Sequence, residues 1–554
     1  MSRKRKVFVI GLDGATFELI KPWVAQGKLP TLEKLMREGA SGTLRSVRPP
    51  ITGPAWASFL TGKNPGAHGV FSWIKRKNNS YDGTPYNSSH IQAEDIGSIL
   101  SRHSRKVCLV NVPCTYPPKV VNGCMLTGLG TPTQDSRFTY PDSLRQELIN
   151  KFDYEVERTQ KYQSGYEDSF RAVVEAIEEK RAKAVLYLMA QYDWDFFMVV
   201  FRGTDVLSHA FWRFIDPTHP AHDPKLASKY GNVLMEHYQQ MDQAVQRIWS
   251  RLDDSTTIIV MSDHGSGPLK RHVYLDNFLL ELGLMKIRRA PASWLRFHLF
   301  KWGLTLTNVR SLLVGLRLEN LVRRVMPMKK RLELSHHVFS VSSIDWANTK
   351  AYPLGANGHI YVNLRGREPE GCVEPGHEYE QVLTLIEGEL LKLRDPDGGQ
   401  RIVSAMWRKE DIYHGGQLAN APDLLIEWKE DAYWAPGTIG RGHGIMSPIM
   451  PEMSSGGHTM DGILIAYGPH IKRGTRLANA QIIDLAPTIL YLLDVPIPSD
   501  MDGHVLEDTF EDAFVQSHSP QLEEVASHWI SKEYEDSLED KKAVEERLRG
   551  LGYI

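Results

Sequence analysis

Four widely separated segments of the sequence carry aspartate or histidine side chains of the types that bind metal ions. They contain Asp13, Asp205 with His209, Asp263 with His264, and His458. Carboxylate oxygens and imidazole nitrogens are common ligands of divalent transition metals. Together these six side chains are enough for two metal sites, and the sequence predicts both.

A fifth segment supplies a hydroxyl group. Thr52 comes just before a predicted helix that has Pro54 in its first turn and the apolar residues 55–60 behind it. A helix N-terminus favours an anion. A threonine hydroxyl is a poor nucleophile until a cation lowers its pKa. With metal ligands elsewhere in the chain, Thr52 is predicted to be the nucleophile of a phosphoryl-transfer enzyme rather than a simple helix cap.

The individual signals differ in strength. Asp205 and His209 are four residues apart, so they share one face of a helix and can chelate one ion, although such a pair is usually a local salt bridge. Asp263 and His264 follow an apolar run, and Gly265 is expected to let the backbone turn there. His458 is expected in a loop that leads into a strand at residues 462–467.

Short β-rich runs alternate with helical patterns along the chain, which indicates an α/β fold with three layers, helix, sheet and helix. The predicted strands are residues 7–12, 106–111, 196–201, 257–262 and 462–467, and the predicted helices include residues 32–38, 165–191 and 229–252. Three strands run into candidate ligands, and open α/β sheets bind ligands beyond the carboxyl ends of their strands. A mostly parallel sheet would therefore gather these residues at one edge.

The composition excludes several classes of protein. A 554-residue chain with 42% hydrophobic residues can bury a large core, and a formal net charge of −2 excludes a globally basic nucleic-acid binder. The four cysteines have no CxxC spacing and are expected to be reduced thiols. The apolar run at residues 7–12 is too short for a signal peptide, and the window that comes closest to a membrane span, 297–316, contains Lys301 and Arg310. A cytoplasmic protein without a transmembrane segment is expected.

Residues 286–331 differ in composition from the rest, with twelve Lys or Arg against the single acidic residue Glu319. We expect a basic helical insertion whose helices cap the core. The alternative is a surface for an anionic substrate, nucleic acid or lipid headgroups, which would permit peripheral membrane contact. The predicted division is a catalytic core at 1–280 and 342–516, a basic helical insertion or cap at 281–341, and a charged helical tail at 517–554.

Taken in order, these segments resemble the alkaline phosphatase superfamily, and most closely its type I phosphodiesterase/nucleotide pyrophosphatase branch. The supporting stretches are residues 11–14, 52–62, 65–69, 204–209, 262–265, 457–458 and 484–488. The resemblance implies that Asp13, Asp263, His264 and the nucleophile Thr52 hold one metal, and that Asp205, His209 and His458 hold the other. It also implies a phosphothreonine intermediate on Thr52. Three carboxylates and three imidazoles suit zinc, and manganese fits the same ligands.

One position departs from that branch, where an asparagine usually stands three residues after the nucleophile to bind a phosphoryl oxygen. This chain has Ala55 there, and Arg271 or His272 is expected to substitute unless the substrate differs. The sulfatase pattern is absent from residues 52–55. Structural roles are expected for His68, His359 and Asp484.

The sequence therefore favours a metal-dependent phosphodiesterase or nucleotide pyrophosphatase that acts on a small phosphorylated substrate, such as a nucleotide, without a stable nucleic-acid partner. A phosphomonoesterase or a phosphoglycerate-mutase-like phosphotransferase is the alternative, because the basic insertion would suit a dianionic substrate. A noncatalytic protein that binds its partner through the basic insertion is a third hypothesis.

Overall fold

The computed structural model describes residues 4–77, 79–158, 161–288, 341–436, 444–451, 454–525 and 534–551. Most of the predicted basic insertion lies outside the described residues, and the division of the chain into core, insertion and tail remains a prediction. Among the described residues, no helix has the length and apolar character needed to cross a bilayer. The cytoplasmic location and the peripheral membrane contact also remain predictions.

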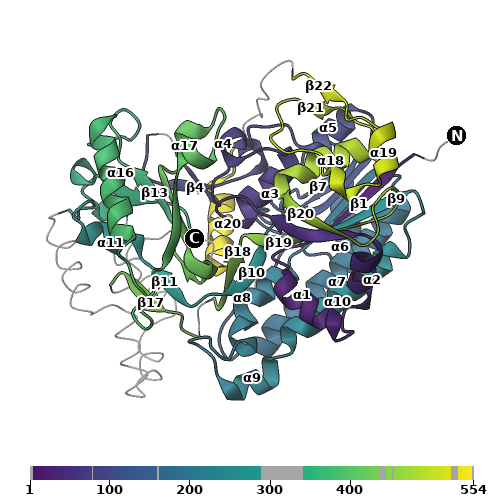
Figure 1. Ribbon diagram of the computed structural model, residues 1–554, viewed down its shortest axis with the longest axis horizontal. Helices are drawn as coiled ribbons and strands as arrows, with labels where there is room; N and C mark the ends of the chain where they lie inside the picture. The colour runs from purple at the N-terminus through teal and green to yellow at the C-terminus, as the bar shows by residue number, and fades with distance from the viewer. Residues whose placement is uncertain are drawn as a thin grey trace.

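A nine-stranded sheet forms the centre of the protein, in the order β20-β2-β19-β9-β1-β8-β5-β6-β7 (Figure 1). Its strands are β1 Lys6–Leu12, β2 Ala40–Arg45, β5 Val107–Val112, β6 Gly123–Thr127, β7 Thr139–Tyr140, β8 Phe196–Phe201, β9 Thr256–Met261, β19 Asp461–Tyr467 and β20 Thr475–Gln481. All five predicted strands are present. The sheet is mostly parallel as predicted, but β19 is antiparallel to both of its neighbours and β7 is antiparallel to β6.

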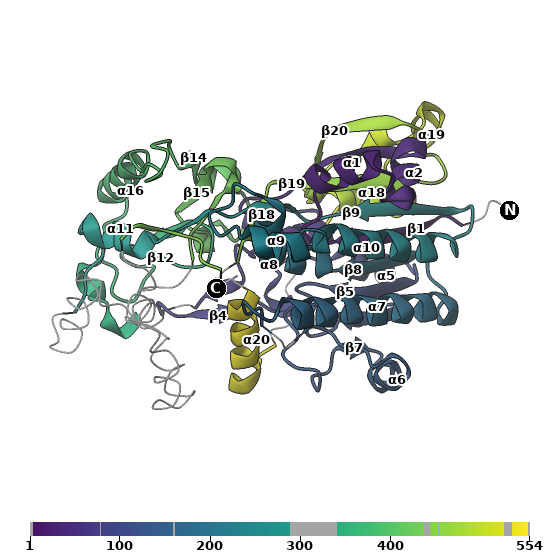
Figure 2. The ribbon, with the colours of Figure 1, turned by 90° about the horizontal axis from the view of Figure 1, so that it is seen from below.

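Both faces of this sheet are covered by helices, because apolar side chains point to both sides of its strands. In β1, Val7 and Val9 pack on one side, against α3 Thr52–Thr61, α5 Ile96–Arg102 and α18 Leu485–Leu492. Phe8 and Ile10 pack on the other side, against α2 Pro30–Glu38, α7 Glu167–Gln191 and α10 Val233–Trp249. Figure 2 shows α7 and α10 lying along the sheet. The predicted three-layer α/β fold is confirmed.

A smaller four-stranded sheet lies beside the large one (Figure 1). It contains β12 Ala351–Pro353, β13 His359–Val362, β14 Val403–Arg408 and β15 Leu424–Trp428, and it packs with α11 Leu275–Glu281 and α16 His377–Leu390. Asp423, at the start of β15, is fully buried and pairs with Arg367 at 2.6 Å and Lys409 at 2.8 Å. This buried ion pair ties loop 364–368 to the small sheet.

The remaining elements connect or flank these two sheets. The helices are α1 Phe17–Ala25, α4 Pro65–His68, α6 Ser143–Phe152, α8 Gly203–Ile215, α9 Pro224–Tyr230, α17 Lys409–Ile412, α19 Asp512–Ser517 and α20 Leu538–Leu551. The short strands are β3 Ile74–Arg76, β4 Gly83–Pro85, β10 Gly265–Pro268, β11 Arg271–Val273, β16 Tyr433–Trp434, β17 Met446–Pro448, β18 Gly456–Thr459, β21 Ile497–Pro498 and β22 Leu522–Glu523.

One edge of the large sheet collects the segments predicted to carry chemistry. Strand β1 lies between β8 and β9 and is parallel to both, so the three carboxyl ends are adjacent. Strand β19 runs the opposite way, so its amino end, preceded by β18, lies at the same edge. Strand β2 is antiparallel to β19, so its carboxyl end and the following helix α3 also lie there.

Two local predictions differ from the structure. His458 lies in strand β18, which pairs with β10, and not in a loop. The pairing was hidden because its partner strand lies about two hundred residues earlier in the chain. Helix α3 begins at Thr52, whose neighbour Ile51 is the N-cap residue, and no side chain caps this helix. The Thr52 hydroxyl is therefore not used as a helix cap.

Candidate active site

The side chains of the second predicted metal site, Asp205, His209 and His458, lie close together. Asp205 Oδ1 lies 3.2 Å from His209 Nε2 and 3.3 Å from His458 Nε2. The two imidazole Nε2 atoms are 3.0 Å apart. Helix α8 carries the first two residues on one face, as their spacing predicted, and strand β18 supplies the third.

The side chains of the first predicted metal site, Asp13, Asp263 and His264, lie beside this second site, at the ends of β1 and β9. His264 Nε2 is 3.3 Å from Asp263 Oδ2 and 3.8 Å from Asp13 Oδ1. The hydroxyl oxygen of Thr52 lies 3.2 Å from the same His264 Nε2. The other oxygen of Asp263 accepts a hydrogen bond from the backbone N–H of Gly14 at 3.2 Å. The structure thus places the predicted nucleophile against the predicted metal ligands.

His264 connects the two groups. Its ring stacks on the ring of His458 with centroids 3.8 Å apart. Ligand atoms of Asp205, His264 and His458 lie within 4.8 Å of one another, as do those of Asp13, Asp263 and His264. The resemblance assigned His264 to the first group alone, whereas the geometry places it within reach of both.

The spacing of these ligand atoms suits metal ions. Oxygen and nitrogen ligands lie about 2.0–2.2 Å from zinc, so two ligands of one tetrahedral ion are roughly 3.4 Å apart. The separations of 3.0–3.3 Å in the second group are close to this value. In addition, Asp13 Oδ1 and Asp263 Oδ2 are buried and accept no hydrogen bond from the described residues. Cations would satisfy these oxygens.

Backbone carbonyl groups orient the three imidazole rings. Each Nδ1 donates to a carbonyl oxygen, which belongs to Gly456 for His209 (2.7 Å), to Pro50 for His458 (2.9 Å) and to Gly265 for His264 (3.0 Å). A proton on Nδ1 leaves the Nε2 lone pair of a neutral ring for a metal. All three Nε2 atoms therefore face the site, where each ring in its neutral form offers an electron pair to a metal.

The electrostatics of the site call for positive charge. Asp13, Asp205 and Asp263 are all fully buried. Burial, and then the neighbouring Asp205, raises the pKa of Asp263 to about 8, and burial with Asp263 raises the pKa of Asp13. Burial also lowers the pKa of His458 to about 3. Carboxylates that resist ionisation, beside a neutral imidazole, are typical of a site in which metal ions supply the missing charge.

The pKa values of Asp205 and His209 shift in the directions that favour their charged forms, unlike those of Asp13, Asp263 and His458. Burial opposes the charge on both groups, but their mutual attraction outweighs it. As a result, the pKa of Asp205 is lowered and the pKa of His209 is raised. Without a metal these two side chains form an ion pair, and a metal must displace the proton from His209.

The sequence did not single out Arg202, which contacts both ligand groups. Its guanidinium lies 3.4 Å from Asp13, 3.5 Å from Asp205 and 3.1 Å from Glu157, and its side chain is almost fully buried. A signal was available, because Arg202 precedes Asp205 by three residues at a predicted strand end. Trp56 was also missed, and its indole N–H donates to Asp13 Oδ2 at 3.2 Å.

Two glycines allow backbone segments next to the candidate ligands to pack closely. A β-carbon on Gly265 would lie 2.3 Å from the carbonyl oxygen of Asp461, and one on Gly456 would lie 2.4 Å from that of Ser208. Neither glycine has a positive φ angle. The predicted reason for Gly265, a turn that needs glycine, is therefore replaced by close contact between backbone segments.

Other predicted residues take part in local contacts. His68 bonds to Ser58 Oγ at 2.8 Å, and Asp484 accepts hydrogen bonds from the backbone N–H groups of His504 and Gln481. Arg271 pairs with Asp395 at 3.0 Å and with Asp397, which does not support the idea that it binds a phosphoryl oxygen in place of an asparagine at position 55.

Comparison with known families identifies the relatives of this chain. Residues 7–444 match the profile of the type I phosphodiesterase / nucleotide pyrophosphatase family. The chain belongs to this family. The resemblance inferred from the motifs is confirmed, and family membership supports a hydrolase of phosphodiester or pyrophosphate bonds.

Solved structures share the fold at low sequence identity. Human ectonucleotide pyrophosphatase / phosphodiesterase 5 has a TM-score of 0.50 and 11% identity, with 92% of this chain and 100% of that chain covered. Phosphonoacetate hydrolase from Sinorhizobium meliloti 1021, in complex with phosphonoacetate, has a TM-score of 0.52 and 13% identity, with 89% and 96% covered. An inactive threonine-to-alanine variant of the murine phosphodiesterase 5, in complex with AMP, has a TM-score of 0.50 and 12% identity, with 92% and 100% covered. Comparison with curated proteins found no significant match.

Proposed function

We propose that this chain is a two-metal phosphodiesterase or nucleotide pyrophosphatase with Thr52 as its nucleophile. The observation that carries the proposal is the position of the Thr52 hydroxyl. It stands at the first residue of α3 and 3.2 Å from His264 Nε2, and His264 itself lies within 4.8 Å of buried carboxylate oxygens of both ligand groups. A hydroxyl that serves only to cap a helix would not need such surroundings.

The ligands would hold two divalent cations, with Asp13, Asp263, His264 and Thr52 around one of them. The other would lie among the remaining ligands, which are Asp205, His209 and His458. The mixture of carboxylates and imidazoles favours zinc, and manganese is the alternative. When bound, these cations would lower the pKa of the threonine hydroxyl and stabilise negative charge on the phosphoryl oxygens.

The chain itself would position the nucleophile and the phosphoryl group. Thr52 Oγ1 would attack phosphorus as the bond from phosphorus to the leaving oxygen breaks, and the hydroxyl proton would pass to solvent water. Water then cleaves the phosphothreonine and restores the hydroxyl. The N-terminus of α3 would attract a phosphoryl oxygen through its dipole and the backbone N–H of Gly53, because Pro54 has no N–H and the Ala55 N–H donates to the Ile51 carbonyl oxygen at 3.0 Å. This helix end would act in place of a side-chain donor at position 55, where Ala55 has none.

A small phosphorylated substrate is the class that we favour. The AMP complex and the phosphonoacetate complex among the structures with a similar fold support this choice. Diester or anhydride cleavage is preferred over monoester cleavage because of the family to which the chain belongs.

The test compares hydrolysis of bis-p-nitrophenyl phosphate with that of p-nitrophenyl phosphate by the metal-loaded protein. We expect faster cleavage of the diester, loss of activity with EDTA, and loss of activity in Thr52→Ala. Thr61→Ala is the matched control, because Thr61 is equally buried at the other end of α3 and its hydroxyl donates to the carbonyl oxygen of Ala57.

Two results would contradict the proposal. Retention of diester hydrolysis by Thr52→Ala would exclude the threonine nucleophile. Preference for the monoester would move the assignment to a phosphatase or mutase. Acid quenching followed by mass spectrometry should also find the added phosphoryl mass on the peptide that contains Thr52.

A further inference from the structure

Helix α8 carries Asp205 and His209 of the second predicted metal site, and its first turn needs hydrogen-bond acceptors from outside the helix. The backbone N–H groups at the start of an α-helix have no acceptor within the helix. The N-cap residue of α8 is Arg202, whose own side chain does not cap the helix. Arg202 and Gly203 are both buried, so their N–H groups depend on acceptors within the protein.

A carboxylate from another helix supplies these acceptors. Glu178 of α7 accepts hydrogen bonds through Oε1 from the backbone N–H groups of Arg202 at 2.9 Å and Gly203 at 2.7 Å. Glu178 is only 2% exposed. A negative charge at a helix N-terminus is also stabilised by the helix dipole. Glu178 therefore fixes the point at which the chain leaves β8 and enters α8, two residues before Asp205.

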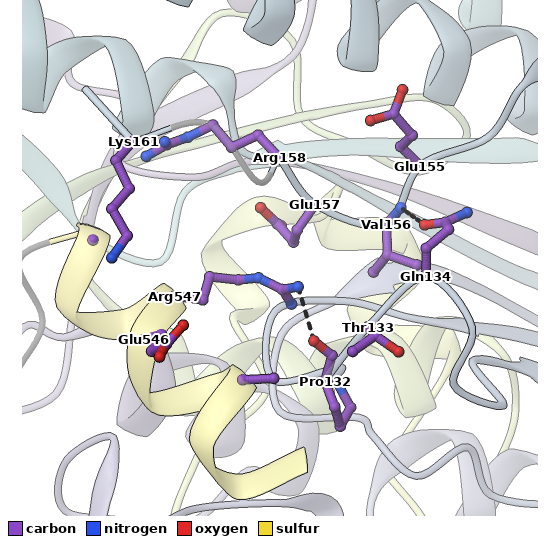
Figure 3. Close-up of a pocket in the computed structure, with 12 residues that line it drawn as sticks. Pro132, Thr133, Gln134, Glu155, Val156, Glu157, Arg158, Lys161, Glu546 and Arg547 are labelled. Atoms are coloured by element: carbon purple, nitrogen blue, oxygen red, sulfur yellow. Dashed lines mark hydrogen bonds between the residues drawn. The ribbon is translucent and has the colours of Figure 1, made fainter. Parts of the chain in front are cut away.

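An ion pair holds Glu178 in place. Its Oε2 accepts from Arg181 at 2.6 Å, and both side chains are buried. Arg181 also donates to the carbonyl oxygen of Val156 at 2.8 Å, and the next residue, Glu157, pairs with the guanidinium of Arg202 at 3.1 Å. Figure 3 shows Val156 and Glu157 in one segment, beside a cavity that helix α20 also lines. Arg202 is thus held at its backbone by Glu178 and at its side chain by Glu157.

Close packing restricts the start of α8 on its other sides. A β-carbon on Gly203 would lie 2.3 Å from Nε2 of His237, which belongs to α10, and 3.1 Å from Cγ of Glu178. The hydroxyl of Thr204 donates to the backbone carbonyl oxygen of Asp13. The first turn of α8 is therefore held by contacts from α7, from α10 and from the end of β1.

We infer that Glu178 is a positioning residue for the second predicted metal site, a role that rests on the two-metal function proposed above. Metal–ligand distances in proteins stay within about 0.2 Å of their ideal values. Helix α8 carries two of the three ligands of this site and β18 carries the third, so a small shift of α8 changes their separation. The Asp and His ligands of the first site follow β1 and β9, so they depend less on α8.

The experiment measures the zinc affinity of the full-length, metal-free protein by competition with a chromophoric chelator. We expect two binding steps per chain, and the step that is lost in His209→Ala belongs to the second site. Glu178→Ala should weaken zinc binding in that step about tenfold, which is the lower end of the range for residues that orient metal ligands. The other step should be unchanged.

Two variants separate this role from a contribution to stability alone. Arg181→Gln breaks the same ion pair but leaves Glu178 Oε1 on the N–H groups of α8, so it should make the protein easier to unfold in urea without changing either zinc affinity. Glu178→Gln keeps an oxygen acceptor for these N–H groups, so it should retain the zinc affinity of the unmodified protein.

A double variant covers the case in which Glu178→Ala does not fold. Glu178→Leu combined with Arg181→Leu removes the acceptor together with the ion pair, and buried ion pairs often tolerate replacement by apolar side chains of similar volume. This double variant should show the same loss of zinc affinity in the second-site step as Glu178→Ala.

Unchanged zinc affinity in that step, in whichever of these two variants folds, would overturn the inference. So would a loss in Arg181→Gln or Glu178→Gln as large as that in Glu178→Ala, because the backbone acceptor would then not be responsible. If the unmodified protein bound fewer than two zinc ions, the two-metal function itself would fail and the inference with it, and this outcome is visible before any variant is measured.

Discussion

Replacement of Arg202 by glutamine gives the sharpest test of how the candidate site is held together. The guanidinium contacts Glu157, Asp13 and Asp205, at 3.1, 3.4 and 3.5 Å. Removing one partner of a buried ion pair typically costs about 3–5 kcal/mol, because the remaining charge is left without a counter-ion. We expect Arg202→Gln to lower the free energy of unfolding of the metal-free protein by about this amount.

Bound metals should reduce this cost. If the proposed ligands hold two cations, Asp13 and Asp205 gain positive neighbours, and only Glu157 loses its charged partner. The expected loss in the metal-loaded protein is then about 1–3 kcal/mol, the range for one unsatisfied buried group. Metals should therefore stabilise Arg202→Gln more than they stabilise the unmodified protein.

The assay is urea unfolding followed by circular dichroism, with EDTA and with added zinc. Arg367→Gln is the matched control, because Arg367 pairs with the buried Asp423 in the smaller sheet and touches none of the proposed ligands. Its loss of stability should be equal with and without metal. The reasoning would be refuted if the stability lost in Arg202→Gln were the same with and without metal. It would also be refuted if the stability lost in Arg367→Gln changed with metal.

Three further outcomes follow from the structure. Because burial and Asp205 raise the pKa of Asp263 to about 8, metal binding at pH 7 should release about one proton from this carboxyl group. Titration calorimetry in buffers of different ionisation enthalpy measures proton release, and a heat of metal binding that is independent of the buffer would contradict this prediction. The same raised pKa means that the contribution of Asp263 to the stability of the metal-free protein is full below about pH 4 and is lost as the pH rises through about 8, so urea unfolding should show this decline in the unmodified protein and less of it in Asp263→Asn. Gly456→Ala places a β-carbon 2.4 Å from the Ser208 carbonyl oxygen, so it should push β18 away from α8, lower the free energy of unfolding by about 1–3 kcal/mol and weaken the binding of one of the two metals. Gly416→Ala is the control, because its β-carbon meets no atom within 4 Å, and it should change neither stability nor metal binding. Equal metal content in the two variants, measured by atomic emission, would show that the contact at Gly456 does not matter.

Local sequence patterns were enough to predict the type of fold and the candidate ligands. The apolar runs that became β1, β8 and β9 are continuous because both faces of the sheet are covered, and each is followed by polar residues where it leaves the core. For that reason Asp13 and Asp263 could be recognised as residues at strand ends. The four-residue spacing of Asp205 and His209 likewise reports directly on one helical face.

The arrangement of these segments depended on tertiary structure. Strand β19 is antiparallel, and this direction brings His458 to the same edge as Asp13, although nothing in its own segment shows which strand it joins. His264 lies between the two ligand groups, and its ring stacks on that of His458, nearly two hundred residues later in the chain.

The partners of Arg202 illustrate the same limit. This residue contacts Asp13, Asp205 and Glu157, and the cavity next to Glu157 is completed by Arg547 from the C-terminal helix. Hydrophobic periodicity records which residues of a segment are buried, because burial acts on each segment separately. It does not record which distant charges meet, because that depends on the order and direction of the strands and on the docking of helices, which only the folded chain determines.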